Sequence, residues 1–148
     1  MSEGNVELVR SIFAAWRLGD YSGAEWAHPE IDYVVADGPT PGTWAGLAAM
    51  AEGARARLNA WADFRFEADE YRELDSERLL VLHRVSGRGR ASALELGKLY
   101  TRGASLFHIR AGKVTRLVQY WDAERALADV GQLPERDAGP DRGYLRPS

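Results

Sequence analysis

Cysteine is absent from the 148 residues of this chain. Its absence excludes disulfide bonds, thiolate nucleophiles and metal sites with cysteine ligands, and it agrees with an expected cytoplasmic location. The three histidines, His28, His83 and His108, are spread along the chain without the spacing of a metal site. A glycine-rich phosphate loop and a Gly-x-Ser-x-Gly motif are also missing from the sequence. We therefore expect no metal and no other cofactor.

The chain also lacks a surplus of charge of one sign. It carries 19 lysines and arginines against 22 aspartates and glutamates, for a formal net charge of -3. The arginines are scattered among carboxylates, so we expect no nucleic-acid partner. No apolar run is long enough to cross a membrane, and the first residues, Met-Ser-Glu-Gly-Asn, are polar and acidic. We therefore expect neither a membrane partner nor a secretory signal.

What the sequence does contain is typical of one globular domain. Hydrophobic residues make up 45% of the chain, and five of the residues are tryptophans. One hydrophobic core can hold a chain of this length together. We expect a single domain over residues 1–133. Residues 134–148 are rich in Pro, Gly, Asp and Arg, which predicts a separate C-terminal tail.

Two helices are predicted before the first strand. Apolar residues on one face predict the first of them, and they are Val9, Ile12, Phe13 and Trp16. Asn5 is expected to cap the start of this helix and Gly19 to end it. A short second helix is predicted over residues 20–26, and Pro29 is expected to end it because residues before proline avoid the helical conformation.

The third predicted helix runs over residues 47–61, because its apolar residues share one stripe: Leu47, Met50, Ala51, Ala54, Leu58 and Trp61. Residues 37–42 are expected to form a loop. After Asp63 the apolar period changes from 3.6 to 2. The predicted strands are residues 31–35, 64–69, 79–85, 94–109 with a bulge at Gly97, and 114–121. Residues 110–113 are expected to form a hairpin turn, and Asp122 to cap a final helical turn.

Several short sequence motifs occur in a characteristic order. They are Val-Arg-Ser-Ile-Phe-Ala-Ala-Trp at residues 9–16 followed by Gly-Asp, His-Pro-Glu-Ile at 28–31, and Gly-Lys-Val at 112–114 leading to Tyr-Trp-Asp at 120–122. With the order of the predicted elements, they resemble the nuclear transport factor two-like superfamily in its SnoaL-like branch. The resemblance implies an α+β cone, in which a curved, mainly antiparallel sheet wraps around three helices of the N-terminal half. It also implies a pocket on the concave face and, frequently, a homodimer.

The superfamily does not imply one reaction, because its members include isomerases, cyclases, hydrolases and proteins without catalysis. Ketosteroid isomerases use a carboxylate base, a tyrosine and a protonated aspartate. These positions align here with Val35, Ile12 and Ser105. Valine and isoleucine neither accept nor donate a proton, so the sequence excludes that mechanism in its usual form.

Two other groups of the superfamily have catalytic residues that can be compared with the last two predicted strands of this chain. Limonene-epoxide hydrolases use an Asp-Arg-Asp relay, and one of those aspartates aligns with Gln119. An amide cannot act as that base. Gln119 can instead orient a polar group of a ligand or lie at the edge of the pocket. SnoaL-type cyclases pair an aspartate with a histidine, and His108 and Asp122 have a suggestive separation. If Phe107 and Trp121 face inward, strand parity directs their neighbours outward. Asp122 then has a capping role.

Two residues remain as candidate bases. His83 lies in an apolar strand, and it faces the interior if Arg84 faces water; an interior imidazole is suited to general-base chemistry. A hydrogen-bonded core histidine and an outward one are the alternatives. Asp37 shares strand parity with Tyr33. It lies two residues beyond Val35, which occupies the position of the isomerase base. The Asp-Gly-Pro sequence at this point is equally typical of a turn.

The sequence thus predicts a SnoaL-like pocket protein that carries out cofactor-independent proton transfer, such as cyclisation, isomerisation or dehydration, on a small apolar organic substrate. His83 or Asp37 is the predicted base, and Tyr33 and Gln119 are predicted to orient the substrate. The other predicted substrate contacts are Trp16, Trp44, Trp61, Ser105, Phe107, Leu117 and Trp121.

Two alternatives stay open: a non-catalytic module for small-molecule binding or dimerisation, and an epoxide hydrolase-like enzyme with altered residues. The alternating apolar pattern around Leu106 agrees with a homodimer formed through the outer face of the long strands. Convergence of His83 and Asp37 on one cavity would favour an enzyme, whereas a pocket without a buried base, acid or ordered polar pair would favour the binding module.

Overall fold

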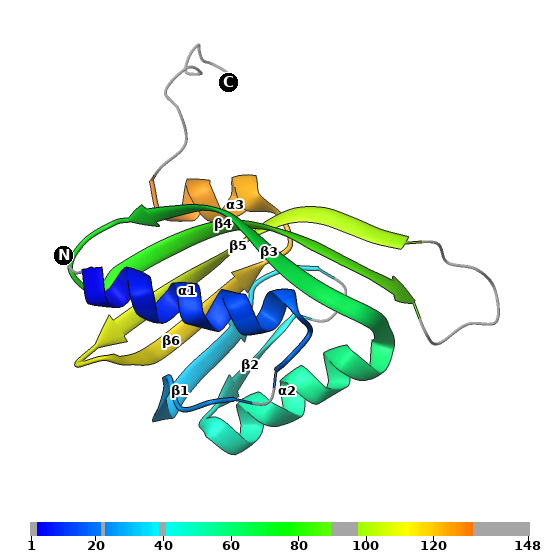
Figure 1. Cartoon of the computed structure of the whole chain (residues 1–148), viewed down its shortest axis with the longest axis horizontal. Helices are drawn as coiled ribbons and strands as arrows, with labels where there is room; N and C mark the ends of the chain where they lie inside the picture. Colours follow the sequence, from blue (N-terminus) through cyan, green and yellow to red (C-terminus); the bar gives the residue numbers. More distant parts are fainter. Residues whose placement is uncertain (1–2, 22, 39–40, 90–97, 132–148) are drawn as a thin grey trace, which may run out of the picture.

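The computed structural model describes residues 3–21, 23–38, 41–89 and 98–131 of the chain. Within this part the elements are, in chain order, α1 (Glu3–Arg17), β1 (Ala27–Val35), β2 (Gly42–Ala45), α2 (Leu47–Ala60), β3 (Trp61–Glu73), β4 (Arg78–Gly89), β5 (Lys98–Arg110), β6 (Lys113–Tyr120) and α3 (Ala123–Asp129). The predicted α+β class with a curved, mainly antiparallel sheet is confirmed (Figure 1). None of the helices in the described ranges is long and apolar enough to cross a bilayer.

The strands form one sheet in the order β2-β1-β6-β5-β4-β3. Neighbouring strands are antiparallel, except that β1 and β6 run parallel. This parallel pair sets Tyr33 beside Leu117 and Val35 beside Gln119. Residues from opposite ends of the sequence therefore become neighbours near the middle of the sheet.

α1 lies across the concave face of the sheet (Figure 1). Its predicted inward side chains are all buried: Val9, Ile12, Phe13 and Trp16. Burial of large apolar side chains such as these contributes about 1.5–3 kcal/mol each. Gly19 ends the helix with a φ of 82°, a conformation that favours glycine. Asn5 is not the cap, because α1 already begins at Glu3 and the Asn5 side chain donates to the Ser76 carbonyl at 3.0 Å.

α3 lies on the opposite, outer face of the sheet and covers a second cluster. Ala126 of α3 is fully buried there, together with Leu80, Ala104, Leu106, Val118 and Tyr120. Asp122 is the N-cap of α3, as predicted, and its carboxylate accepts a hydrogen bond from the Glu124 backbone at 3.0 Å. The third helix of the fold thus follows the last strand, so the described N-terminal half holds only α1 and α2.

The predicted short helix over residues 20–26 is wrong, because the described residues of that segment are not helical. The segment is instead held against the start of β6. The Trp26 carbonyl accepts a hydrogen bond from the Val114 amide at 2.8 Å. The Lys113 ammonium donates to the Glu25 carbonyl. These tertiary contacts satisfy two carbonyl groups that would have had no internal partner at the end of the predicted helix.

Pro29 lies inside β1 and does not end a helix, which corrects a second prediction. The register of β1 with β6 skips from Ala27 to Asp32, so the missing proline N–H costs no hydrogen bond of the ladder. β2 lies partly in the predicted loop, and its four residues are too few to show a period in the sequence. The predicted turn at residues 110–113 is confirmed, with positive φ at both central residues.

Some predictions concern residues outside the described part. The bulge at Gly97 and the tail over residues 134–148 are among them. The side chains of Leu58 and Trp61, which we expect to be buried as members of the apolar stripe of the third predicted helix, also lie outside it.

Candidate functional site

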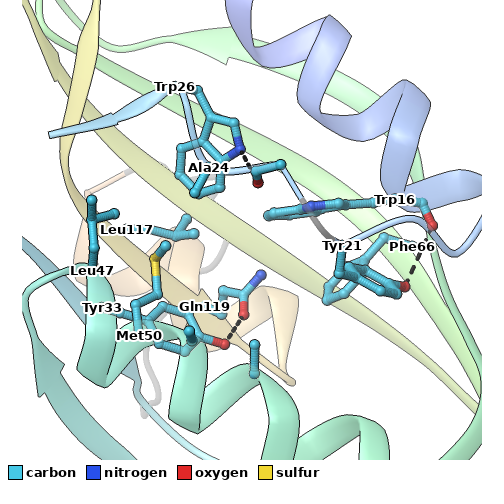
Figure 2. Close-up of a pocket in the computed structure, with 13 residues that line it drawn as sticks. Trp16, Tyr21, Ala24, Trp26, Tyr33, Leu47, Met50, Phe66, Leu117 and Gln119 are labelled. Atoms are coloured by element: carbon cyan, nitrogen blue, oxygen red, sulfur yellow. Dashed lines mark hydrogen bonds between the residues drawn. The ribbon is translucent and has the colours of Figure 1, made fainter. Parts of the chain in front are cut away.

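A cavity of about 170 Å³ lies on the concave side of the sheet. It is bounded by the sheet, by α2 and by the segment that joins α1 to β1 (Figure 2). Its lining is mainly apolar and consists of Trp16, Tyr21, Gly23, Ala24, Trp26, Tyr33, Leu47, Met50, Ala51, Ala54, Phe66, Leu117 and Gln119. The cavity lies where the family resemblance implies a pocket.

Aromatic rings form the wall on the α1 side. Trp16 packs on Phe66 with ring centres 5.1 Å apart, and it meets Trp26 edge-on at 6.1 Å. Tyr21 is fixed by its hydroxyl, which donates to the Phe64 carbonyl at 2.5 Å. Interlocked rings have few rotamers, so this wall is held in one shape.

α2 forms the opposite wall, and its small alanines leave the space that the rings do not fill. The helix comes close to β2 because Gly53 has no side chain: a Cβ there would lie 2.9 Å from the Trp44 ring. Trp44 in turn packs on Tyr33, with ring centres 5.5 Å apart. Trp44, a predicted substrate contact, therefore supports Tyr33 and is not among the residues that line the cavity.

One corner of the cavity is polar. The Tyr33 hydroxyl donates to Gln119 Oε1 at 2.6 Å (Figure 2). Both side chains are buried, at 3% and 5% exposure. They come from β1 and β6, whose parallel register places Val35 opposite Gln119. The predicted polar orienters thus meet in the cavity, and together they present hydrogen-bonding groups in an apolar surrounding.

The polar corner continues into the core. Gln119 Nε2 donates to Ser105 Oγ at 3.4 Å, and Ser105 Oγ lies 3.0 Å from His83 Nε2. His83 faces inward, at 2% exposure, with its ring centre 5.7 Å from that of Phe13 and 5.1 Å from that of Phe66. It lines a second cavity of only about 10 Å³. Gln119 and Phe66 border both cavities.

Asp37, the other predicted base, has a different environment. Its carboxylate accepts a hydrogen bond from the Trp121 backbone amide at 2.6 Å, which joins the ends of β1 and β6. Asp37 is not among the lining residues of either cavity. The structure therefore does not bring Asp37 and His83 together at one cavity.

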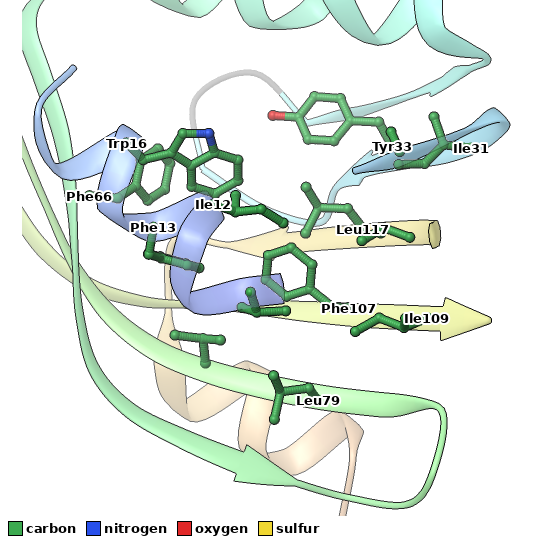
Figure 3. Close-up of a cluster of buried hydrophobic side chains, with 14 of the residues drawn as sticks. Ile12, Phe13, Trp16, Ile31, Tyr33, Phe66, Leu79, Phe107, Ile109 and Leu117 are labelled. Atoms are coloured by element: carbon green, nitrogen blue, oxygen red, sulfur yellow. The ribbon is translucent and has the colours of Figure 1, made fainter. Parts of the chain in front are cut away.

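The remaining predicted contacts divide into lining and supporting residues. Trp16 and Leu117 line the main cavity, whereas Trp121 lines the smaller one. Phe107 is fully buried in the core, with its ring centre 6.4 Å from that of Trp16 (Figure 3). The Trp61 side chain lies outside the described part of the chain.

Sequence reasoning missed several lining residues. Tyr21 and Trp26 fell within the wrongly predicted helix, and their aromatic character was the available signal. Met50 and Ala54 were recognised only as a helical apolar stripe, which has the same pattern whether it faces core or cavity.

His108 and Asp122 do not form a catalytic pair in the cavity. His108 lies on the outer face, where burial, followed by the charges of Arg116 and Arg78, lowers its pKa. Asp122 is exposed at the start of α3. Both residues face outward, as strand parity predicted. Among the described residues, no group of three or more His, Asp or Glu side chains is arranged to hold a metal ion.

A family model described as the SnoaL-like domain matches residues 9–117. A comparison with curated proteins gives no match. An NTF2-like protein of unknown function from Burkholderia pseudomallei is similar in structure, with a TM-score of 0.71 at 20% identity over 86% of this chain and 97% of the other. TerC, co-crystallised with polyporic acid, gives 0.68 at 21% identity over 86% and 98%. A protein with a ketosteroid isomerase-like fold from Catenulispora acidiphila, solved with trimethylamine, gives 0.64 at 15% over 88% and 96%. These structural likenesses show the fold alone.

Proposed function

The chain belongs to the SnoaL-like domain family, and on that premise we propose that it binds a small, mainly apolar organic molecule in the cavity between α2 and the sheet. The observation that carries this proposal is the buried Tyr33–Gln119 pair in an otherwise apolar lining. Apolar walls supply affinity, and a single polar corner fixes orientation. The co-crystallisation of TerC with polyporic acid supports ligand binding as a use of this fold.

The test is titration of the protein with 1-indanol, a fused-ring alcohol, followed by tryptophan fluorescence. Trp16 and Trp26 line the cavity, so occupation should change their emission. Ala54→Phe places a ring in the cavity and should abolish the response. Ala48→Phe, on an exposed position of the same helix, is the matched control and should leave it intact. Equal responses from both variants would contradict binding in this cavity.

A second candidate is cofactor-independent proton transfer, such as cyclisation, isomerisation or dehydration, with His83 as the base. The buried His83–Ser105 pair favours it. An amide is not a base, so Gln119 cannot substitute for His83. From the main cavity, the reacting carbon would reach His83 through the small cavity that both Gln119 and His83 line, which has space for about one water-sized group. Asp37 has less support, because its carboxylate is engaged by Trp121.

This chemistry can be tested by exchange of the protons beside the carbonyl of 1-indanone in D₂O, followed by NMR. A catalytic base should accelerate the exchange, and His83→Gln should reduce the acceleration by roughly a hundred- to ten-thousandfold. Asp37→Asn is the comparison, expected to retain the rate. No acceleration by the wild-type protein would leave binding as the function. An epoxide hydrolase-like reaction has less support, because the position of one of the aspartates in the relay is occupied by Gln119, which has no carboxylate.

A homodimer through the outer face also remains a proposal. Leu106, the residue that suggested it, is only 6% exposed within one chain and belongs to the cluster with Ala126 of α3. A dimer through this face would therefore use residues around Leu106 more than Leu106 itself. Light scattering at micromolar concentration tests it, and a monomeric mass would contradict it.

A further inference from the structure

Aromatic rings form much of the lining of the main cavity. Four of them lie together on the α1 side, and they belong to Trp16, Tyr21, Trp26 and Phe66. Tyr33 adds a fifth ring from β1. Among the described residues that line the cavity, none carries a charged side chain. A ligand in this cavity therefore meets ring surface and hydrocarbon over most of its own surface.

The rings are close enough together to act on one bound group. The ring centre of Trp16 lies 5.1 Å from that of Phe66 and 6.2 Å from that of Tyr21. The ring centre of Trp26 lies 6.1 Å from that of Trp16. Figure 2 shows Trp16 in profile, with one face of its indole turned toward Tyr33 across the cavity. A ring attracts a cation that lies within about 6 Å of its centre, so a group seated on this face is within reach of several rings at once.

The charge of a ligand matters to such a group of rings. The face of an aromatic ring is negative because of its quadrupole, so it attracts a cation more strongly than a neutral group of equal size. No lysine, arginine or histidine in the described lining opposes a positive charge, and the formal net charge of -3 favours one. A quaternary ammonium has no N–H group, so its burial leaves no donor without a partner. The lining is therefore suited to a cation that presents methyl groups.

We infer that the cavity is an aromatic cage that selects a quaternary ammonium group over a neutral group of the same shape. An apolar cavity of about 150 Å³ holds benzene, so the cavity of about 170 Å³ in this protein has room for a trimethylammonium group on a short chain. The methyl groups contact the rings as an apolar ligand does, and the positive charge adds attraction. The inference rests on the proposed binding function and specifies its ligand class.

The test compares choline with 3,3-dimethylbutan-1-ol, in which a neutral carbon replaces the charged nitrogen of the same skeleton. Their dissociation constants are measured by calorimetry, with tryptophan fluorescence as the second method. We expect choline to bind roughly tenfold more tightly, which is within the range of cation–π contacts. Equal affinities, or a preference for the neutral alcohol, would overturn the selection of a cation while the binding function stands. If 1-indanol binds and neither of these compounds does, the inference again fails alone, and if none of the three binds, both proposals fail.

Substitution of Trp26 tests whether the rings are the source of the preference. Trp26 is only partly buried, on the segment between α1 and β1, so we expect its variants to fold. Trp26→Leu keeps an apolar contact without a ring and should lower the preference for choline by roughly two- to fivefold, whereas Trp26→Phe keeps a ring and should retain most of it. The affinity for the neutral alcohol is the control and should change little in either variant. An equal preference for choline in both variants and in the wild-type protein would overturn the inference.

Two further measurements separate the cage from the general charge of the protein. Sodium chloride at about 0.5 M screens the field of exposed carboxylates much more than contacts inside a cavity, so the preference for choline should persist. Ala54→Phe fills the cavity and should abolish choline binding, whereas Ala48→Phe, at an exposed position of α2, should not. Loss of the preference at high salt, or choline binding by Ala54→Phe, would place the cation at the protein surface and overturn the inference.

Discussion

The two faces of the sheet are packed in different ways. On the concave face, aromatic rings from α1, β3 and β5 meet mostly at steep angles, and a cavity remains beside α2. On the outer face, mainly aliphatic side chains lie with the small Ala126 of α3. Large rigid rings opposite small alanines leave space, whereas short aliphatic chains adapt to one another. The same strands thus serve as one wall of a cavity and as ordinary core.

β4 shows the difference residue by residue. Leu79 and Val81 belong to the concave cluster, whereas Leu80 between them belongs to the outer one. A strand covered on both faces has no polar alternation, which explains the uninterrupted apolar run at this point. The difference in packing between the two faces can therefore be tested by substitution of single residues.

The largest effect is expected from Phe107→Ala on the concave face. Phe107 is fully buried, with ring centres of Phe13 and Trp16 at 6.0 and 6.4 Å. Its neighbours cannot fill the space of the lost ring, so the free energy of unfolding should fall by about 3–5 kcal/mol. Urea denaturation measures it.

Leu106→Ala, on the outer face, is the control for Phe107→Ala, because it also removes a large buried side chain. It should cost about 2–5 kcal/mol, yet the folded protein should keep its affinity for 1-indanol because Leu106 belongs to the other cluster. A loss below about 1 kcal/mol for Phe107→Ala would contradict the central place of the ring cluster.

An intermediate effect is expected when one substitution is made on both faces. Ala126→Leu forces extra methylenes into a fully buried position and should cost about 1–3 kcal/mol. Ala54→Leu directs the same atoms into the cavity that Ala54 lines, so the free energy of unfolding should change by less than about 0.5 kcal/mol or rise. Urea denaturation of both variants decides, and equal losses would mean that the concave face is as tightly packed as the outer one.

A smaller effect is expected at the start of α3. Asp122→Ala removes the carboxylate that accepts from the Glu124 backbone and should lower the stability by about 1 kcal/mol. Asp122→Asn keeps a capping oxygen and is the matched control. Thermal unfolding measures both. A loss of 1-indanol binding in Asp122→Ala, at unchanged stability, would instead connect the outer face to the cavity.

The smallest effect is a pH dependence on the outer face. Burial, followed by Arg116 and Arg78, lowers the pKa of His108 below its ordinary value of 6.5. As the pH falls, the unfolded chain binds this proton first, so the stability from His108 is present above pH 6.5 and is lost as the pH falls below 6.5 toward the folded value. His108→Gln should remove this loss. The difference between the two stability curves measures it, and a difference of the opposite sign would contradict the lowered pKa.

The elements that the sequence predicted well are those with a clean period. The apolar stripe of α1 is buried, because packing of such a stripe stabilises the helix that presents it; its members are Val9, Ile12, Phe13 and Trp16. The prediction of a helix over residues 20–26 was wrong because contacts with a distant strand, not local sequence, determine the structure of that segment. That prediction used only neighbouring residues such as Pro29, whereas the segment's actual partners, Lys113 and Val114, are remote in sequence.

The candidate site was predictable only in part. Strand parity indicated that Gln119 shares the inward face of Leu117, and both are buried. For His83 the same argument left both faces open, and the structure places the side chain inside. The role of Asp37 was not accessible in this way, because its hydrogen bond to Trp121 depends on the pairing of two distant strands. The same pairing decides that Tyr33 meets Gln119.

That parallel pairing also has a kinetic consequence. Tyr33 and Gln119 are separated by 86 positions, whereas β3, β4, β5 and β6 pair with their neighbours in sequence. Contacts between near neighbours close short loops and form early, and the closing of a long loop is slow. The cavity is therefore complete only when the first strand docks at the end of folding. A molecule that needs both side chains cannot bind a chain whose first strand is still detached, so it should slow unfolding rather than speed folding.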